Sequence, residues 1–275
     1  MMSARIPKSN LHTHTDFCDG TDSAERMVLA AIEAGMDTLG FSGHSTIFFD
    51  LECSMTREAT AEYRKEILRL RKQYGDRLHI LLGIEQDLYA DEPASGYDYV
   101  IGSVHYLHID GEYSAVDLSK QSLTELVNRH FSGDFYRFAR HYFELVATLP
   151  QKTGCDIIGH FDLLSKFNTA GDLFDENDPR YLRPAMDALD ALLARDVIFE
   201  INTGAMSRGY RKTPYPAPIF LHRIAEGRGR VTLSSDAHRS NALLYAFSEA
   251  MHIARAAGLG SLAVMTRQGW QTFSL

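Results

Sequence analysis

The chain alternates short β-rich segments with longer amphipathic segments, and this alternation recurs seven times along its 275 residues. Short apolar runs are typical of buried strands, whereas apolar residues at three- and four-residue spacing are typical of helices. The pattern predicts seven strands, over residues 10–14, 38–42, 79–85, 99–105, 156–160, 197–202 and 231–235. The helices expected between them cover residues 22–34, 56–74, 122–130, 135–149, 183–195, 217–226 and 241–257.

Strands that alternate with helices are joined by right-handed crossovers and lie parallel to one another. A closed barrel satisfies the strand edges better than an open sheet of this strand count, so we predict an α/β fold of the (β/α)7 barrel type. Residues 1–275 are expected to form a single domain. An open doubly wound sheet is the alternative, but its glycine-rich turn G-x-G-x-x-G is absent from the first strand and loop, LHTHTDFCDG.

Composition excludes several classes of partner. The chain has 28 Lys and Arg against 36 Asp and Glu, and this balance of −8 disfavours nucleic-acid binding by bulk positive charge. The longest uncharged apolar runs, such as 27–32, fall far short of the roughly 20 residues needed to cross a bilayer. The first ten residues lack the apolar stretch of a secretory signal, so we expect no membrane partner and a cytoplasmic location. The oligomeric state is left open.

Histidine is unusually frequent, with 12 residues, whereas cysteine is scarce. Cys18, Cys53 and Cys155 are odd in number and form no C-x-x-C pair, which disfavours a disulfide framework or a cysteine zinc site. In barrels, active sites lie where the strands end. Six of the seven predicted strands end at or lead into potential metal ligands, namely His12 and His14, His44, Glu85, His105, His160, and Asp236 with His238.

Geometry supports a shared metal site at these strand ends. Residues two apart on a strand point to the same face, so His12 and His14 can hold one ion, as can Asp236 and His238. A lone histidine at a strand end is more often a hydrogen-bonded core residue. Burying this many imidazoles and carboxylates without ions, however, would leave costly unpaired polar groups.

The ligand types narrow the choice of metal. Imidazole and carboxylate ligands without thiolates suit zinc, iron or manganese, and they disfavour magnesium, which prefers oxygen ligands. The candidates outnumber what one four- or five-coordinate ion requires. We therefore predict two or three divalent transition-metal ions that share Glu85 as a bridging ligand.

Seven segments, in order over residues 11–239, resemble the signature of the polymerase and histidinol phosphatase (PHP) family: LHTHTDFCDG, GFSGHS, GIEQDL, IGSVHYL, IIGHFDLL, EINTGA and LSSDAHR. The SVH and GHFDLLSKF blocks and the N-T-G-x-x-x-R pattern resemble its histidinol-phosphate phosphatase branch. The resemblance implies a distorted seven-stranded TIM-like barrel with up to three metals at the C-terminal rim. It also implies hydrolysis of L-histidinol phosphate to L-histidinol and inorganic phosphate in histidine biosynthesis.

The same resemblance implies how the ligands are divided. One metal would lie on His12, His14, Glu85 and Asp236, a second on Glu85, His105 and His160, and a third on His44, His238 and a residue of the loop after His14. The commonest family pattern has another histidine in that loop, where this chain offers Asp16 and Asp19. Asp19 is preferred because its neighbours lie closest to the family's loop spacing.

Charge then indicates the chemistry. Three divalent ions with Glu85, Asp236 and Asp19 would leave a site charge of about +3, which suits a phosphate dianion. Phosphate-monoester hydrolysis is among the slowest uncatalysed reactions, and one general acid or base accelerates a reaction only about 10²- to 10⁴-fold. We therefore expect a metal-bridging hydroxide as nucleophile and no phospho-enzyme. Asp19 or His238 would help to protonate the departing alkoxide.

Basic groups are expected to hold the remaining phosphate oxygens, and arginine can do so with two hydrogen bonds. Arg208 is the first candidate, followed by Lys166 and Arg239, although each is equally consistent with a solvated surface charge. Glu200 is either a partner of a metal ligand or a member of an internal ion pair. His108 and the Asp-Gly turn after it predict a hairpin beside the site.

Other functions are weighed against this one. A PHP-family phosphodiesterase or nuclease is disfavoured by the acidic balance and the lack of an attached polymerase region. An amidohydrolase also begins with H-x-H on a barrel strand, but a bridging lysine would be common where this chain has Glu85. A non-enzymatic metal-binding regulatory module is disfavoured by the candidate ligands at the strand ends.

Overall fold

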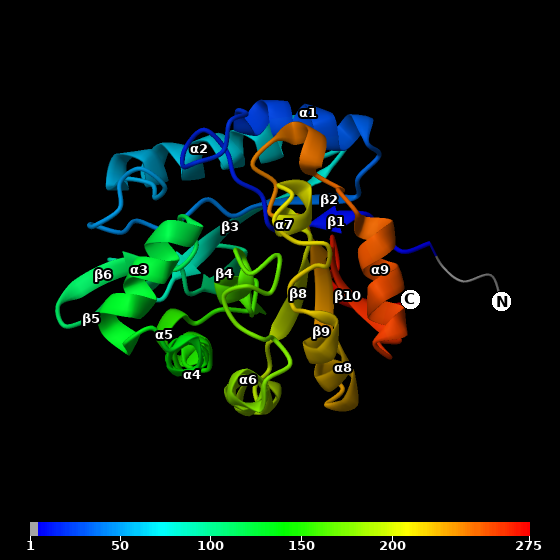
Figure 1. Cartoon of the computed structure of the whole chain (residues 1–275). Coiled ribbons are helices and arrows are strands. Elements are labelled where there is room, and N and C mark those ends of the chain that lie inside the picture. Colours follow the sequence, from blue (N-terminus) through cyan, green and yellow to red (C-terminus); the bar gives the residue numbers. More distant parts are fainter. Residues whose placement is uncertain (1–4) are drawn as a thin grey trace.

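The computed structural model describes residues 5–275, in which seven parallel strands are surrounded by helices (Figure 1). In the order of the sheet, the strands are β1 (Ser9–Asn10), β2 (Thr38–Phe41), β3 (His79–Asp87), β4 (Tyr99–Ser103), β7 (Ile157–Ile158), β8 (Ile198–Asn202) and β9 (Arg230–Ser234). Past the ends of β1 and β9, Thr13 and Ala237 form an isolated parallel bridge, in which His14 N donates to Ala237 O at 2.9 Å. The predicted barrel is confirmed, and it is nearly closed.

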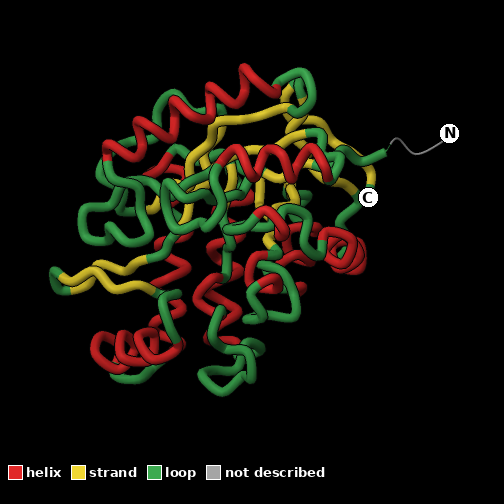
Figure 2. The backbone as a smooth tube through the Cα atoms, turned by 90° about the horizontal axis from the view of Figure 1, so that it is seen from above, coloured by secondary structure: helices red, strands yellow, loops and turns green. Residues whose placement is uncertain are grey.

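The helices pack around the outside of the strands (Figures 1 and 2). They are α1 (Ala24–Glu33), α2 (Arg57–Tyr74), α3 (Lys120–Phe131), α4 (Phe135–Val146), α5 (Leu149–Thr153), α6 (Pro179–Leu193), α7 (Gly204–Ser207), α8 (Pro218–Glu226) and α9 (Phe247–Ala256). Helix α9 is shorter than expected, because the 3-10 turn η2 (Ser240–Ala242) precedes it. The short helices α5 and α7 were not predicted, since segments of four or five residues carry no readable helical period.

Local capping chemistry sets where several helices begin. Thr56 caps α2, because its hydroxyl accepts a hydrogen bond from the first turn. Helix α1 begins differently from the expectation, since its cap is Ser23, whereas Asp22 accepts from Ser240 N at 2.7 Å and joins two loops. Helix α6 starts earlier than expected, because Asp178 caps it and proline occupies its first position.

A small apolar cluster fills the barrel interior and is separate from the larger layer between strands and helices. Tyr99 anchors this interior, because its hydroxyl donates to the carbonyl oxygens of Leu11 and Phe41. Its ring occupies space beside two glycines, and a Cβ atom at Gly83 would lie only 2.2 Å from the ring. Because Gly40 and Gly83 have no side chain, a large aromatic ring fits inside a narrow barrel.

Two antiparallel hairpins extend the barrel. The hairpin of β5 (Tyr106–Ile109) and β6 (Glu112–Ala115) agrees with the expectation around His108, and it projects on the left in Figures 1 and 2. The hairpin of β10 (Ser261–Thr266) and β11 (Gly269–Ser274) was not predicted. It lies where the strands begin, since Thr38 Oγ1 donates to Met265 O at 2.9 Å and Ala263 belongs to the interior cluster.

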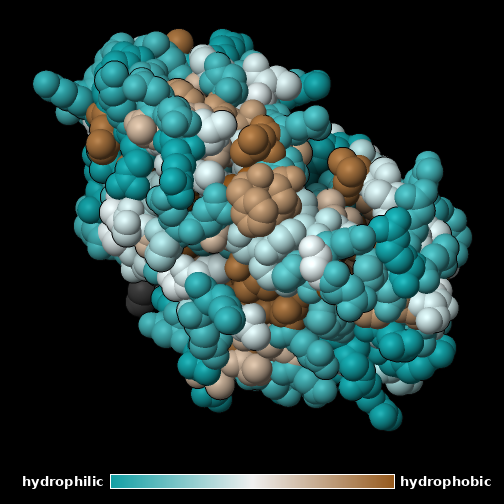
Figure 3. Space-filling view, turned by 90° about the vertical axis from the view of Figure 1, so that its left-hand side faces the viewer, coloured by the Kyte–Doolittle hydropathy of each residue, from teal (hydrophilic) through white to brown (hydrophobic). Residues whose placement is uncertain are grey.

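One face of the molecule carries its hydrophobic groups in separate patches (Figure 3). The face drawn in Figure 3 is mostly hydrophilic, with small brown areas between teal ones. Among residues 5–275, no helix combines the length and apolar character needed to span a membrane.

Candidate metal centre

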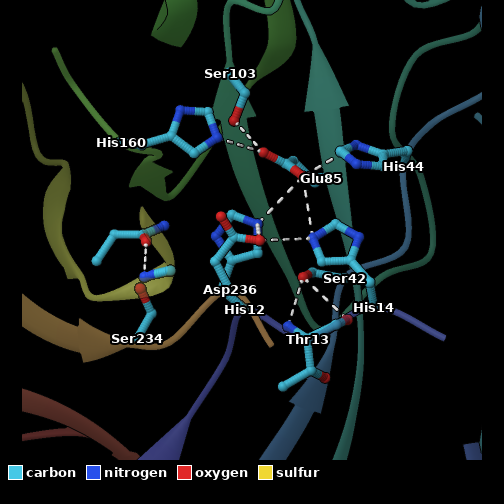
Figure 4. Close-up of polar contacts among 12 residues, drawn as sticks. His12, Thr13, His14, Ser42, His44, Glu85, Ser103, His160, Ser234 and Asp236 are labelled. Carbon is cyan, nitrogen blue, oxygen red and sulfur yellow. Dashed lines mark hydrogen bonds and ion pairs between the residues drawn. The ribbon is translucent and has the colours of Figure 1, made fainter. Parts of the chain in front are cut away.

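The structure brings all nine predicted metal ligands together at the carboxyl ends of the strands. Figure 4 labels His12, His14, His44, Glu85, His160 and Asp236 among them. They form four overlapping groups, and within each group the candidate ligand atoms lie within 4.8 Å of one another. The groups are His14, Asp19, His44 and His238; His12, Glu85 and His160; His12, His14 and Asp236; and His44, Glu85 and His105.

Glu85 lies at the centre of the cluster. It belongs to β3, its side chain is buried, and Ser103 Oγ donates to its Oε1 at 2.6 Å. The five imidazole nitrogens nearest to it are His12 Nε2 (3.2 Å), His14 Nε2 (3.5 Å) and His44 Nδ1 (3.1 Å) around Oε2, and His160 Nε2 (2.9 Å) and His105 Nε2 (3.4 Å) around Oε1. Because each oxygen faces its own set of imidazoles, this carboxylate has the geometry of a bridging ligand.

Asp236 completes the group that includes the first two histidines. Its Oδ1 lies 3.3 Å from His14 Nε2 and 3.8 Å from His12 Nε2. The backbone of Asp236 has a φ of 47°, a conformation that costs free energy in a non-glycine residue. Gly204 packs directly against it, since a Cβ atom there would lie 2.8 Å from the Asp236 side chain. The surrounding structure therefore holds Asp236 in place.

The loop after the first strand supplies Asp19 to the remaining group. Its Oδ2 lies 2.9 Å from His238 Nε2, and its Oδ1 lies 3.6 Å from both His44 Nε2 and His14 Nδ1. Asp16, the alternative considered from sequence, is exposed. The structure thus places Asp19, in preference to Asp16, beside the histidines.

Two further carboxylates orient the imidazoles. Glu200 Oε2 lies 2.8 Å from His12 Nδ1, and Asp87 Oδ2 lies 3.2 Å from His105 Nδ1. An ionised carboxylate only accepts hydrogen bonds, so each Nδ1 donates and each Nε2 is left to face the cluster. Glu200 is therefore the partner of a candidate ligand. Asp87 was missed, although its position two residues after Glu85 on one strand was a usable signal.

Burial and charge shift the pKa values of His14 and Glu85 in the cluster. Burial, together with repulsion from His238, lowers the pKa of His14 to about 3, which leaves a neutral imidazole. Burial alone would raise the pKa of Glu85, but the neighbouring His12 and His44 hold it well below the usual range. A neutral imidazole and an ionised carboxylate are the forms that bind metal ions.

Unpaired atoms show that the cluster fits divalent cations. His12 Nε2, His14 Nε2, Glu85 Oε2 and Asp19 Oδ1 are buried and have no hydrogen-bond partner. Leaving such atoms unpaired costs about 1–3 kcal/mol each, and shared cations would satisfy them together. The mixed nitrogen and oxygen donor set also suits divalent transition metals.

Comparison with known proteins identifies the family. The PHP domain model matches residues 10–204. The chain belongs to the PHP family. A provisionally named histidinol-phosphatase of Deinococcus radiodurans is 31% identical over 261 residues, which cover 90% of this chain and 92% of that relative.

Solved structures share the PHP barrel. A provisionally named histidinol phosphatase of Listeria monocytogenes has a TM-score of 0.75 at 22% identity, over 88% of this chain and 99% of that one. The histidinol phosphate phosphatase of Lactococcus lactis, solved with zinc, L-histidinol and phosphate, has a TM-score of 0.69 at 20% identity. That match covers 96% of this chain and 98% of the other.

A cavity of about 230 Å³ opens beside the candidate metal ligands, and two of the three predicted substrate-binding residues line it. Arg208 Nη2 donates to Asp236 Oδ2 at 3.0 Å, so its guanidinium lies directly beside the candidate ligands. Lys166 pairs with Asp117, a cavity residue that sequence reasoning missed. Arg239 is exposed and lies outside the cavity lining, so the structure gives this third candidate no place in the site.

Proposed function

We propose that this protein is a metal-dependent phosphomonoesterase, a histidinol-phosphatase, which hydrolyses L-histidinol phosphate to L-histidinol and inorganic phosphate in histidine biosynthesis. The observation that carries the proposal is the cluster around Glu85, which joins nine candidate metal ligands to a cavity lined by Arg208. The name of the Deinococcus relative supports the substrate. The L-histidinol and phosphate in the Lactococcus structure support it further.

The proposed cofactors are two or three divalent ions of zinc, iron or manganese. Zinc in the Lactococcus structure supports this choice. The proposed ligand sets are His12, His14, Glu85 and Asp236 for one ion, Glu85, His105 and His160 for a second, and His44, His238 and Asp19 for a third. When bound, such ions lower the pKa of water and offset the negative charge of a phosphate group.

The protein's own groups would position the phosphate and the leaving alcohol. The Arg208 guanidinium, held by Asp236, can donate to phosphate oxygens that enter the cavity. Burial would raise the pKa of Asp19, but His44 and the hydrogen bond from His238 hold it far below the usual range. Asp19 Oδ2 and His238 Nε2 lie 2.9 Å apart, and this pair is the candidate source of a proton for the departing alcohol through a bound water.

The test combines elemental analysis of gently purified protein with a phosphate-release screen. We expect at least two equivalents of transition metal per chain and the highest kcat/KM on L-histidinol phosphate. Release of nucleotides from single-stranded DNA, with no release of phosphate, would favour a PHP nuclease. Failure of every metal-loaded form to cleave an aryl phosphate would favour a non-enzymatic metal-binding role.

A further inference from the structure

One acidic residue of the cavity has no role in the proposed hydrolysis. Within residues 5–275, four carboxylate side chains line the cavity, and three of them, Asp19, Glu85 and Asp236, belong to the metal cluster. The fourth is Asp117, which follows β6. The residue before it donates its backbone N–H to the His105 carbonyl oxygen at 2.8 Å, which holds this segment beside the cluster. A cavity proposed to accept a phosphate dianion therefore contains a carboxylate outside the metal cluster.

Lys166 pairs with this carboxylate. Its Nζ donates to Asp117 Oδ2 at 2.9 Å and to the Asp117 carbonyl oxygen at 2.8 Å. Only 13% of the Lys166 side chain and 24% of the Asp117 side chain are exposed. The ammonium group also lies 5.4 Å from the ring centroids of Phe167 and Tyr210. The two charges are thus shielded from bulk water. In such a place, a neighbouring group of like charge would cost free energy.

L-Histidinol phosphate carries both charges that this ion pair could exchange. Its phosphate could accept hydrogen bonds from Lys166, and its α-ammonium group could replace Lys166 at Asp117. A phosphomonoester without a cation would instead leave Asp117 facing the dianion alone. The same carboxylate would thus attract an aminoalkyl phosphate and repel a simple alkyl or aryl phosphate.

We propose that Asp117 is a specificity residue that binds the α-ammonium group of the substrate, while Lys166 moves its hydrogen bonds to the phosphate. This inference rests on the proposed phosphomonoesterase function. It assigns the selectivity for an amine-bearing alcohol to one ion pair on the cavity wall.

The test is a cycle of two enzymes and two substrates. L-Histidinol phosphate is compared with 3-(imidazol-4-yl)propyl phosphate, which lacks only the amino group. At pH 7.5 the imidazole of both substrates is largely neutral, so the two substrates differ in charge only by the ammonium group. Asp117→Asn should lower kcat/KM for L-histidinol phosphate by at least about 10-fold, because a charge-assisted hydrogen bond is lost. It should raise kcat/KM for the deamino substrate, because the repulsion is removed.

Two further variants separate charge from structure. Asp117→Glu keeps the negative charge and should keep the preference for the amine. Asp172→Asn removes the same charge from a half-exposed residue that pairs with Lys120 outside the cavity, and it should change neither kcat/KM. Calorimetric titration with inorganic phosphate provides a binding readout, and Asp117→Asn should bind phosphate more tightly.

The outcomes distinguish the inference from the function on which it rests. Equal changes in kcat/KM for both substrates, or no change for either, would overturn the assignment of Asp117 and leave the proposed hydrolysis intact. A wild-type enzyme that releases phosphate from neither substrate would instead refute the proposed function, and this inference with it.

Discussion

At the scale of single residues, the cluster depends on carboxylates that are not themselves candidate ligands. Glu200 accepts from His12 Nδ1, and it also accepts from the backbone N–H of His160 at 2.6 Å. One buried carboxylate therefore orients two of the proposed ligands. Partners of this kind fix the imidazole tautomer and raise the basicity of the nitrogen that faces the metal.

Replacing this carboxylate should weaken metal binding. Glu200→Gln keeps the size of the side chain but removes its charge, and we expect metal affinity to fall about 10- to 100-fold. Competition with a chromophoric chelator measures the affinity. Glu226→Gln, on the exposed face of α8, is the matched control. Equal affinity in both variants would show that Glu200 does not support the ligands.

Arg208 is expected to act on the substrate, with little effect on the metals. Arg208→Ala should raise KM about 10- to 100-fold, because charged hydrogen bonds to phosphate are lost. Metal content should stay unchanged, since Asp236 keeps its position beside His14. Steady-state kinetics and elemental analysis check the two parts. The exposed Arg239 provides the control variant Arg239→Ala, and an equal KM in both variants would remove Arg208 from the site.

Cys53 lines the cavity but should react slowly with alkylating agents. Burial, followed by the negative charge of Asp50, raises the pKa of its thiol to about 11. The reactive thiolate at pH 8 is then roughly 100-fold scarcer than in a cysteine with a pKa of 9. The rate at which iodoacetamide alkylates Cys53, followed by mass spectrometry, should be low at pH 8 and rise towards pH 11. Fast alkylation at pH 8, relative to N-acetylcysteine, would contradict this prediction.

At the scale of elements, the interior of the barrel is shaped by the contact of β3 with β4. The Tyr99 ring lies against Gly83, and the two residues are paired in the strand register. The candidate ligand Glu85 follows two residues later on β3. The packing that closes the barrel thus also determines where this carboxylate lies.

Adding a methyl group at this contact should destabilise the protein. Gly83→Ala places a Cβ atom 2.2 Å from the Tyr99 ring, so the ring or the strand must shift. We expect the free energy of unfolding to fall by about 1–3 kcal/mol, as for other overpacked cores. Urea denaturation measures it. Gly260→Ala, where no atom lies within 4 Å of the added Cβ, is the control, and an equal loss there would contradict the packing argument.

At the scale of the whole molecule, the cluster links strands that are distant in sequence. Its candidate ligands come from the ends of strands β1, β2, β3, β4, β7 and β9, and from the loop after β1. Ions bound by these residues would hold both sides of the barrel seam, where the Thr13–Ala237 bridge lies between the first and last strands. The metals should therefore contribute to the stability of the fold as well as to chemistry.

Removing the metals should lower the stability of the barrel. An ion present at 100 times its Kd stabilises the folded state by about 2.7 kcal/mol, and a chelator would remove that contribution. Urea denaturation with and without EDTA measures the difference. Zinc added back in excess of the chelator should restore the urea concentration at which half of the protein is unfolded. An unchanged midpoint would show that the barrel closes without help from ions.

The sequence by itself determined the seven strand segments of the barrel and the candidate ligands, because strand patterning and donor chemistry are local properties. His12, Glu85 and His160 could be identified since each lies at the end of its own apolar segment. Only the tertiary structure decided which nitrogens surround each Glu85 oxygen, that Lys166 pairs with Asp117, and that the hairpin of β10 and β11 lies at the start of the strands. These relations depend on strand register and barrel closure, which bring together residues far apart in the chain, such as Asn10 and Ser235, which are hydrogen-bonded across a separation of 225 positions.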